Sequence, residues 1–589
     1  MPGLKLTTEQ AAGRSIIRGL RRTALMVIVA SVTGFSGYAP AADAADSSAA
    51  AKAFTYKTPQ GVTFVVTAEG LSSIRYADRE LATGAWRAGS GEDWFRYGNG
   101  RVAADKITEK SLEILDGNRA RVRHVMQDIT ADYSYVFDGE DVTVTARLEN
   151  ANPAEEMAVA RFYGLKFDFG RPPAGVMCTQ HISYFQFPGH GIAMCHPSGF
   201  SNIGGSYAVN EAVGIGVSPS RTGLVRTLIL WDHGDWAHQE TDPCRNLNYF
   251  VVAPTPAAGA RTYEMKLRVS PDRDWKHLLA PYKEHFQGTF GPVQYKADNR
   301  WAASFYANKS MQAVSEKNPY GFHDGMARLD LPEGVQALCE FMLKQFREGG
   351  GQGMILWGQG GEEPRGGMYR PDFDILPPEV EAQWPALARQ FKEAGVRLGV
   401  TARPRHMAVR VSWKSDGIID INADDEGHRQ VLWNRFKNMI ARGCTLFYLD
   451  SFGDSLEDVK LMQFLRRQMG PDIRTFAEHQ CDAIMPFSGG YSETELNGDA
   501  EGKTGSYAFW SGLRNWEIYR WLAPGSQMVS RLFRTNSKAP ENVEPAERFW
   551  FRNHITPLVV YGRPTVSVAE LKAMQAEYVD DQGQWKDGP

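Results

Sequence analysis

Alternation of apolar and polar residues dominates the first half of the chain, from position 54 to about 270. Val142, Val144, Ala146 and Leu148 fall on one face of an extended segment, and the turn residues before Val142 predict a hairpin with 133–137. Further alternating runs occupy 63–67, 224–231 and 262–269. Because turn signals recur every ten to fifteen residues and no long helical period appears, this region predicts a large antiparallel β-sandwich domain over 54–270.

The pattern changes near position 271. Trp275, Leu278, Leu279, Tyr282 and Phe286 lie on one side of a helix, which predicts a linker helix within 271–290. Beyond it, short apolar runs alternate with segments of helical period. Predicted strands occupy 301–306, 353–357, 396–402, 444–449, 472–477, 527–533 and 556–561, with the sixth strand of the series left uncertain. This βα alternation predicts a parallel (β/α)8 TIM-type barrel over 291–589.

The clearest single unit is the apolar strand that ends at Asp450. A predicted helix over 426–443 precedes it, and another over 455–469 follows it. In a (β/α)8 barrel the carboxyl ends of the strands form the active-site face, so an acid at this point indicates catalysis. A helix cap or a structural ion pair is the alternative explanation for Asp450.

Other polar side chains follow the neighbouring predicted strands. Those expected to contact substrate are Trp357 and Gln359 after the second strand, Arg403, Arg405 and His406 after the third, and His479 after the fifth. Glu478 precedes His479 and supplies a second carboxyl group close to Asp450. Glycoside hydrolysis requires one ionised and one protonated carboxyl group, which this pair can supply.

The roles of the two acids follow from their expected surroundings. Arg403 or Arg405 beside Asp450 would keep it ionised, and a less polar environment would leave the proton on Glu478. Asp450 is therefore the expected nucleophile and Glu478 the expected acid/base. Asp482, Glu493 and Glu495 remain open as alternative acids, and loop ion pairs remain open as the role of the two arginines.

The N-terminus has the pattern of an export signal. Arg18, Arg21 and Arg22 precede an apolar stretch, and small residues follow at Ala39, Ala41 and Ala44. We expect a signal peptide over 1–44, a disordered tail over 45–53, and a secreted or periplasmic protein without a membrane anchor. In such a compartment Cys178 and Cys195 could form a disulfide, a point that the sequence leaves open.

Composition narrows the classes of partner. A net charge of −4 gives no reason to expect nucleic acid or an anionic membrane as a partner. The chain contains 15 Trp, 22 Tyr and 30 Phe, which suits stacking on sugar rings and equally suits a large core. No cysteine and histidine cluster has zinc spacing, so no metal or other cofactor is expected.

The segment from 417 to 454 resembles the retaining α-glycosidases of the α-galactosidase-like (β/α)8 superfamily, which also join a β-sandwich to a barrel. The resemblance implies that Asp450 is the nucleophile and that Asp420 belongs to the substrate site. Tyr448 stands where those enzymes usually have lysine. The acids on strands four and five look more like the endo-α-N-acetylgalactosaminidase type.

We therefore expect a glycoside hydrolase that cleaves α-linked sugars by retaining double displacement. An inverting or differently paired glycosidase is the alternative within enzymes, and a non-catalytic carbohydrate-binding protein is the alternative outside them. The sugar, the linkage, endo or exo action and the oligomeric state stay open.

Overall fold

The computed structural model describes residues 52–84, 95–97, 107–161, 167–168, 175–178, 182–195, 226–231, 246–252, 255–307, 327–360, 370–408, 418–453, 456–479, 481–498, 505–509, 516–534, 544–560 and 567–588. The predicted signal peptide and nearly all of the predicted tail lie outside these residues. None of the described helices is long and apolar enough to span a bilayer.

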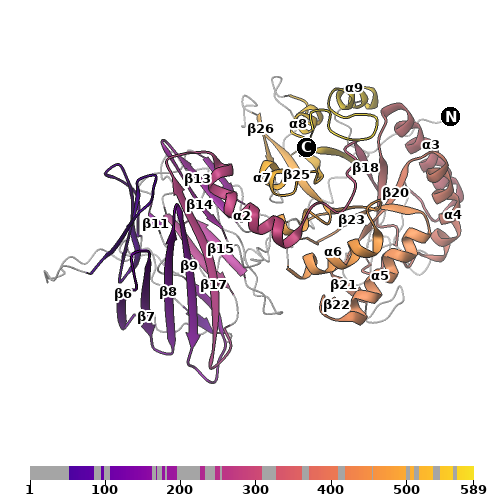
Figure 1. The fold of residues 1–589 in the computed structure, drawn as a ribbon. Coiled ribbons are helices and arrows are strands. Elements are labelled where there is room, and N and C mark those ends of the chain that lie inside the picture. Colours follow the sequence, from indigo (N-terminus) through magenta and orange to yellow (C-terminus); the bar gives the residue numbers. More distant parts are fainter. Residues whose placement is uncertain are drawn as a thin grey trace. The chain divides into compact units, whose positions relative to one another are not determined.

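Two antiparallel sheets form the N-terminal region (Figure 1). The first comprises β1 (Phe54–Lys57), β2 (Val62–Thr67), β3 (Gly70–Tyr76), β4 (Arg79–Gly84), β5 (Phe95–Tyr97), β10 (Met157–Arg161), β11 (Phe167–Asp168), β15 (Arg226–Trp231) and β16 (Asn246–Val252). The second comprises β6 (Glu109–Ile114), β7 (Arg119–Met126), β8 (Ile129–Asp138), β9 (Asp141–Asn150), β12 (Gly175–Cys178), β13 (Ile182–Phe187), β14 (His190–Cys195) and β17 (Gly259–Ser270).

The alternation seen in the sequence builds the core between these sheets. Phe64 of the first sheet and Val122, Tyr133 and Val144 of the second belong to one buried cluster. The predicted hairpin is β8 with β9, and its register pairs Phe137 with Val142. Cys178 and Cys195 lie in β12 and β14, the two neighbours of β13, and their side chains are outside the described residues.

The linker helix is α2 (Trp275–Phe290). Asp274 caps its N-terminus, and the Asp274 side chain accepts a hydrogen bond from the Lys276 N–H. Its buried residues include Leu278, Leu279, Tyr282 and Phe286, as the sequence predicted. The helix packs on β13, β14 and β17 and also contacts α7 (Trp516–Leu522).

Eight parallel strands close into a ring, which confirms the predicted TIM-type barrel. In ring order they are β18 (Ala302–Tyr306), β19 (Gly353–Trp357), β20 (Arg397–Ala402), β23 (Cys444–Leu449), β24 (Arg474–Ala477), β25 (Gly489–Gly498), β27 (Met528–Arg534) and β28 (Thr556–Val560). Pairing of β28 with β18 closes the ring. The uncertain sixth strand is β25, which pairs with both β24 and β27.

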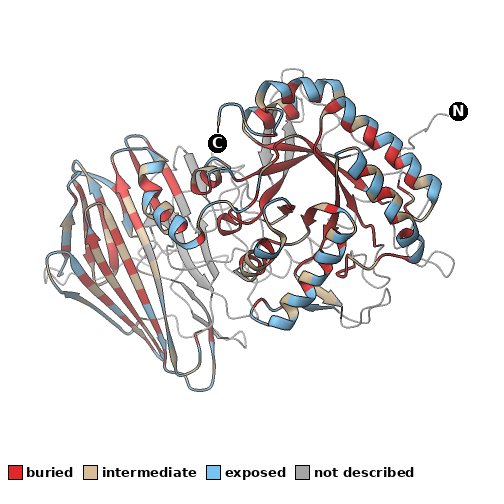
Figure 2. Ribbon diagram, turned by 45° about the vertical axis from the view of Figure 1, so that its right-hand side comes forward, coloured by how far each residue is buried: buried red, intermediate tan, exposed pale blue. Residues whose placement is uncertain are grey.

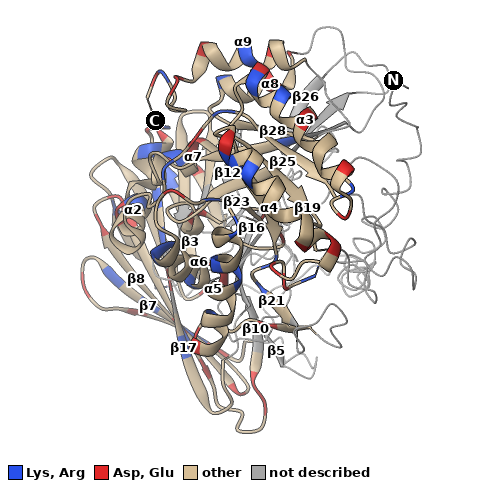
Figure 3. Cartoon of the chain, turned by 90° about the vertical axis from the view of Figure 1, so that its right-hand side faces the viewer, with Lys and Arg blue, Asp and Glu red and all other residues tan. Residues whose placement is uncertain are grey.

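The remaining elements surround or extend this ring. They are α3 (Pro332–Gly349), α4 (Pro378–Glu393), α5 (Glu426–Ala441), α6 (Leu456–Met469), the 3₁₀ helix η6 (Asp482–Ile484), α8 (Ala546–Arg552), α9 (Val568–Tyr578), the hairpin β21 (His406–Ala408) with β22 (Ile418–Asp420), and β26 (Gly505–Phe509), which pairs antiparallel with β25. Figure 2 shows the barrel strands as a buried ring and the larger helices exposed on their outer sides. Residues of both charge signs lie along these helices (Figure 3).

The strand period sorts barrel side chains into two sets. On β23, Leu446 and Tyr448 belong to the apolar cluster inside the ring, whereas Phe447 and Leu449 belong to the cluster shared with the surrounding helices. Phe476 of β24 likewise points inward. Every second residue of a barrel strand faces the interior, so a residue two positions beyond the last inward-facing one also faces inward.

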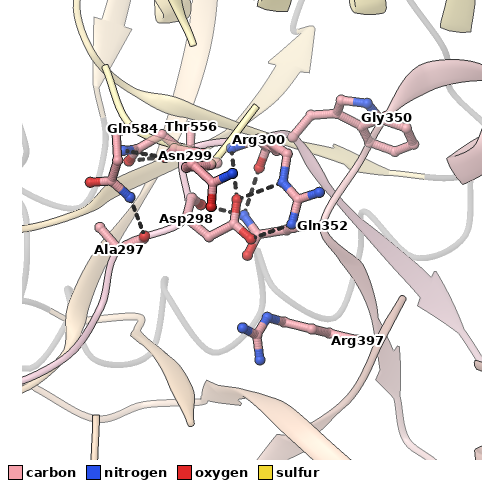
Figure 4. A network of polar contacts seen from close by, with 12 residues as sticks. Ala297, Asp298, Asn299, Arg300, Gly350, Gln352, Arg397, Thr556 and Gln584 are labelled. Carbon is pink, nitrogen blue, oxygen red and sulfur yellow. Dashed lines mark hydrogen bonds and ion pairs between the residues drawn. The ribbon is translucent and has the colours of Figure 1, made fainter. Parts of the chain in front are cut away.

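Amide side chains tie together the amino-terminal end of the barrel (Figure 4). The Gln352 amide donates to the main-chain oxygens of Asp298, at 2.7 Å, and Arg300, at 2.6 Å. The Arg300 guanidinium forms an ion pair with the Asp298 carboxylate at 2.7 Å. Asn299 donates to the Gly583 carbonyl at 3.1 Å, which joins the first strand to the C-terminal segment. This end of a TIM barrel supports stability, and the opposite end carries chemistry.

Candidate active site

Asp450 and Glu478 lie side by side at the carboxyl end of the barrel. The Asp450 N–H donates to the Ala402 carbonyl at 2.8 Å, and the Glu478 N–H donates to the Leu449 carbonyl at 3.1 Å. These bonds extend the ladders of β20, β23 and β24 by one residue. Since Asp450 follows Tyr448 by two positions and Glu478 follows Phe476 by two, both acids continue the inward-facing set.

The charge of Glu478 acts directly on Asp450. Only 14% of the Asp450 side chain and 23% of the Glu478 side chain are exposed. Two carboxylates this close cannot both be ionised at low energetic cost, so the pair holds one proton.

The surroundings determine where that proton lies. Burial, together with the charge of Glu478, raises the pKa of Asp450 to about 8, against the opposing effect of Arg403. Burial also raises the pKa of Glu478, but the hydrogen bond and charge of His479 and the Ser451 N–H outweigh it and lower that pKa to about 2. These surroundings favour the proton on Asp450.

This distribution is the reverse of the one expected from the sequence, and the contacts explain the difference. Arg405 was expected beside Asp450, but it donates instead to Asp458 of α6, at 3.1 Å from its Nε. Arg403 is nearly fully buried, and its Nε lies 3.5 Å from Asp450, a long ion pair. His479 Nε2 lies 3.4 Å from Glu478 and stabilises that carboxylate instead.

The turn after Asp450 aims a main-chain donor at Glu478. Ser451 has a φ of +53°, an uncommon conformation for a non-glycine residue. Its N–H donates to Glu478 at 2.6 Å. Gly453 follows with a φ of +122°, and a Cβ there would lie 1.9 Å from the His479 oxygen. Any side chain at position 453 would therefore force this turn away from the segment that carries Glu478.

A buried ion pair holds the same turn from below. Asp458 is fully buried and accepts from the Gly453 N–H at 2.9 Å and from Arg405. The turn also bonds to the next strand's loop, because the N–H groups of His479 and Cys481 donate to the oxygens of Phe452 and Gly453 at 2.9 Å each. In the sequence, Asp458 is recognisable only as an acid near the start of the helix predicted over 455–469.

The other predicted substrate residues divide into two groups. The first group lies with the acid pair. Arg403 contacts Asp450 and His479 contacts Glu478. The Trp357 ring lies 4.4 Å from the ring of Tyr448, which precedes Asp450 by two positions on the same strand. Gln359 instead donates to the oxygens of Phe373, at 3.1 Å, and Thr401, at 3.2 Å.

His406 and Asp420 pair with each other in the β21–β22 hairpin. His406 Nδ1 lies 2.9 Å from Asp420, whose side chain is 76% exposed. Burial, together with the charge of Arg403, lowers the pKa of His406. No contact between Asp420 and the acid pair is present among the described residues.

The alternative acids have different environments. Asp482 is fully buried and accepts a hydrogen bond from the Tyr282 hydroxyl of α2 at 2.7 Å. Glu493 and Glu495 lie in β25, paired with Arg531 and Phe533 of β27, and their side chains are outside the described residues.

Sequence reasoning missed Arg531, which lies on β27. Its guanidinium stacks 5.8 Å from the Trp357 ring and donates to the Tyr306 hydroxyl at 3.2 Å. Arg531 follows the inward-facing Val529 by two positions, so the period of that predicted strand could have identified it. Among the described residues, no group of three or more acidic, histidine or cysteine side chains could hold a metal ion.

Comparisons with known proteins agree with this architecture. No protein-family model matches the sequence, and no curated protein matches it. Among solved structures, α-N-acetylgalactosaminidase NagBb from Bifidobacterium bifidum in complex with GalNAc is similar, with a TM-score of 0.61 and 11% identity over 89% of this chain and 92% of that one. Its ligand-free form has a TM-score of 0.57 at 10% identity, over 89% and 93% of the two chains.

An α-galactosidase from Thermus thermophilus matches over 76% of this chain and 92% of that one, with a TM-score of 0.40 and 12% identity. The similarity to NagBb confirms, at the level of fold, the resemblance inferred from the sequence: this chain has the sandwich-and-barrel architecture of NagBb.

Proposed function

We propose that the protein is a retaining α-glycosidase in which Asp450 is the nucleophile and Glu478 is the acid/base. The observation that carries the proposal is the pair of acids, Asp450 and Glu478, at the ends of neighbouring strands on the carboxyl end of a (β/α)8 barrel. Retaining enzymes hold their carboxyl groups roughly 5–5.5 Å apart, and inverting enzymes roughly 6.5–9.5 Å apart to admit a water. Asp450 and Glu478 follow neighbouring strands, and the N–H of the residue after Asp450 bonds to Glu478, which favours the short separation.

The first step requires the proton to move. Asp450 must be ionised to attack the anomeric carbon. Glu478 must be protonated so that it can give its proton to the leaving oxygen. Because the two acids are neighbours at adjacent strand ends, the proton passes from Asp450 to Glu478 when substrate binds. Positive charge that develops at the sugar beside Asp450 favours the ionised form of Asp450, and Arg403 at 3.5 Å supports it.

Catalysis then proceeds in two displacements. The Asp450 oxygen bonds to the anomeric carbon while Glu478 protonates the departing oxygen. Glu478, now ionised, takes a proton from water, whose oxygen attacks the same carbon and releases Asp450. His479 and the Ser451 N–H contact Glu478 in both of its roles.

The first substrate to test is a terminal α-linked N-acetylgalactosamine, because NagBb acts on that sugar and matches both parts of this chain. α-Linked galactose is the second. Trp357 offers an aromatic face for the sugar, while Arg403 and His479 offer polar contacts to it. We assign Gln359 and Arg405 to the support of the loops that carry these residues.

The experiment is a comparison of the p-nitrophenyl α- and β-glycosides of N-acetylgalactosamine, galactose and glucose. We expect release of p-nitrophenol from an α-glycoside, and loss of that release in Asp450→Asn. Release from none of the six, or undiminished release by Asp450→Asn, contradicts the proposal.

A further inference from the structure

Tyr448 lies inside the barrel, two positions before Asp450 on the same strand. Its side chain is fully buried. Its ring lies 4.4 Å from the Trp357 ring and 4.9 Å from the Tyr491 ring, so aromatic contacts fix its direction. Because residues two apart on a strand face the same side, Tyr448 stands directly below Asp450 in the inward-facing set.

The Tyr448 hydroxyl has no hydrogen-bond partner among the described residues. Buried hydroxyl groups without a partner are rare in folded proteins because water is lost and nothing replaces it. In a phenylalanine at this position the same ring contacts would form without that loss. Packing therefore accounts for the ring and leaves the hydroxyl unexplained.

Both members of the acid pair act on the Tyr448 hydroxyl. Glu478 and Asp450 both act electrostatically on Tyr448, and so does Arg531 on the opposite side of the barrel. Burial, reinforced by the charge of Glu478, raises the pKa of Tyr448 well above its ordinary value, so the hydroxyl keeps its proton and can donate it in a hydrogen bond.

We propose that Tyr448 is a substrate-recognition residue whose hydroxyl donates a hydrogen bond to one oxygen of the sugar ring held at Asp450 and Glu478. This inference rests on the proposed function and extends it to the choice of sugar. A sugar that lacks the recognised oxygen forms no bond with this hydroxyl, so it binds more weakly than one that carries the oxygen. The acceptor is a hydroxyl or acetamido oxygen, which a neutral donor suits.

The test combines Tyr448→Phe with deoxy substrates. On the p-nitrophenyl α-glycoside that the wild type cleaves, Tyr448→Phe should lower kcat/KM by about 10- to 100-fold. One monodeoxy analogue should be cleaved correspondingly poorly by the wild type and show no further loss in Tyr448→Phe. For deoxy analogues at the other ring positions, the fold-loss from the missing oxygen and the fold-loss from Tyr448→Phe should multiply. Multiplication at every position overturns the proposal.

Stability separates recognition from a structural role. Because the hydroxyl has no partner among the described residues, Tyr448→Phe should keep or raise the melting temperature. Tyr282→Phe is the matched control: it removes a hydroxyl that is bonded to Asp482, so it should lower the melting temperature without a preference among the deoxy analogues. A lowered melting temperature in Tyr448→Phe with equal losses on all substrates assigns a structural role and contradicts the inference.

If the wild type cleaves no glycoside, the proposed function fails and binding still decides the inference. Calorimetric titration with free N-acetylgalactosamine and galactose then compares the wild type with Tyr448→Phe. Weaker binding by the variant supports recognition by Tyr448, and equal binding, or none by either protein, overturns it.

Discussion

The Ser451 N–H donates a 2.6 Å hydrogen bond to the Glu478 carboxylate, although Ser451 belongs to the turn that carries Asp450. The left-handed backbone of Ser451, with a φ of +53°, directs this N–H across to the neighbouring strand. One turn therefore positions one acid and sets the charge of the other. A strained residue of this kind is costly, and such residues cluster at functional sites.

Replacement of Asp450 by asparagine should separate activity from stability. Activity should fall at least about 10⁴-fold, because no nucleophile remains. The folded protein should become more stable by about 1–3 kcal/mol at pH 7, since asparagine resembles the protonated acid and needs no proton on folding.

The stability gain has a defined pH dependence. The pKa of Asp450 in the folded protein, about 8, lies above its unfolded value of roughly 3.9. The wild type therefore loses stability relative to Asp450→Asn as pH rises from about 4 to about 8, and the two should match below about pH 4. Denaturant unfolding of both proteins at pH 4, 6 and 8 measures the difference, and a gain that is constant with pH contradicts this explanation.

Activity should depend on the single proton of the acid pair. Glu478 cannot protonate the leaving oxygen once that proton is lost, so kcat/KM should fall about tenfold per pH unit above about pH 8. On the acid side, kcat/KM should begin to fall only toward pH 2, and it is measured only where the protein is still folded. A profile centred below pH 5 would show that the proton belongs to another group.

The ion pair below the catalytic turn should contribute to both stability and rate. Arg405→Ala leaves the fully buried Asp458 carboxylate without its cation, which should destabilise the protein by about 3 kcal/mol. The turn that carries Asp450 should also loosen, so kcat should fall more than the affinity for substrate. Arg442→Ala is the control, because its pair with Glu381 is exposed and should contribute less than about 1 kcal/mol. Equal effects of the two changes would contradict a positioning role for Arg405.

Export is a separate prediction that rests on the sequence alone. Expressed in a bacterium with a periplasm, the protein should be recovered outside the cytoplasm with a new N-terminus near Ala42 or Ala45. Edman sequencing of the mature protein checks this. A mature chain that still begins at Met1 or Pro2 overturns the prediction.

The barrel was predictable because most of its strands are short apolar runs between helices of clear period. β25 was not, because its first residues are Gly489 and Gly490 and its later positions alternate glutamates with small or polar residues. Such a composition has the signal of a turn or an exposed strand. Only its pairing with β24 and β27 identifies it as a barrel strand.

The acid pair followed from strand period, but its charge state did not. That state depends on Arg405, whose partner Asp458 lies 53 positions away, and on His479, whose contact with Glu478 depends on the loop geometry. Asp420 was assigned by resemblance, and the structure places it in an exposed hairpin with His406. Long-range pairing of charges leaves no periodic trace in a sequence.

The roles of Asp450 and Glu478 are the central claim, and the anomeric configuration of the glycosyl azide that each variant forms tests them most directly. Azide is a small anion that needs no deprotonation, so it can replace the missing carboxylate or the activated water. Glu478→Gln should still form the glycosyl-enzyme from an activated aryl α-glycoside, and azide attack on that β-linked intermediate gives the α-glycosyl azide. In Asp450→Ala, azide attacks the α-glycoside itself and gives the β-glycosyl azide. Proton NMR of the two products distinguishes them. We predict α-azide from Glu478→Gln and β-azide from Asp450→Ala; the opposite assignment would exchange the two roles, and no azide product from either variant would contradict the retaining mechanism.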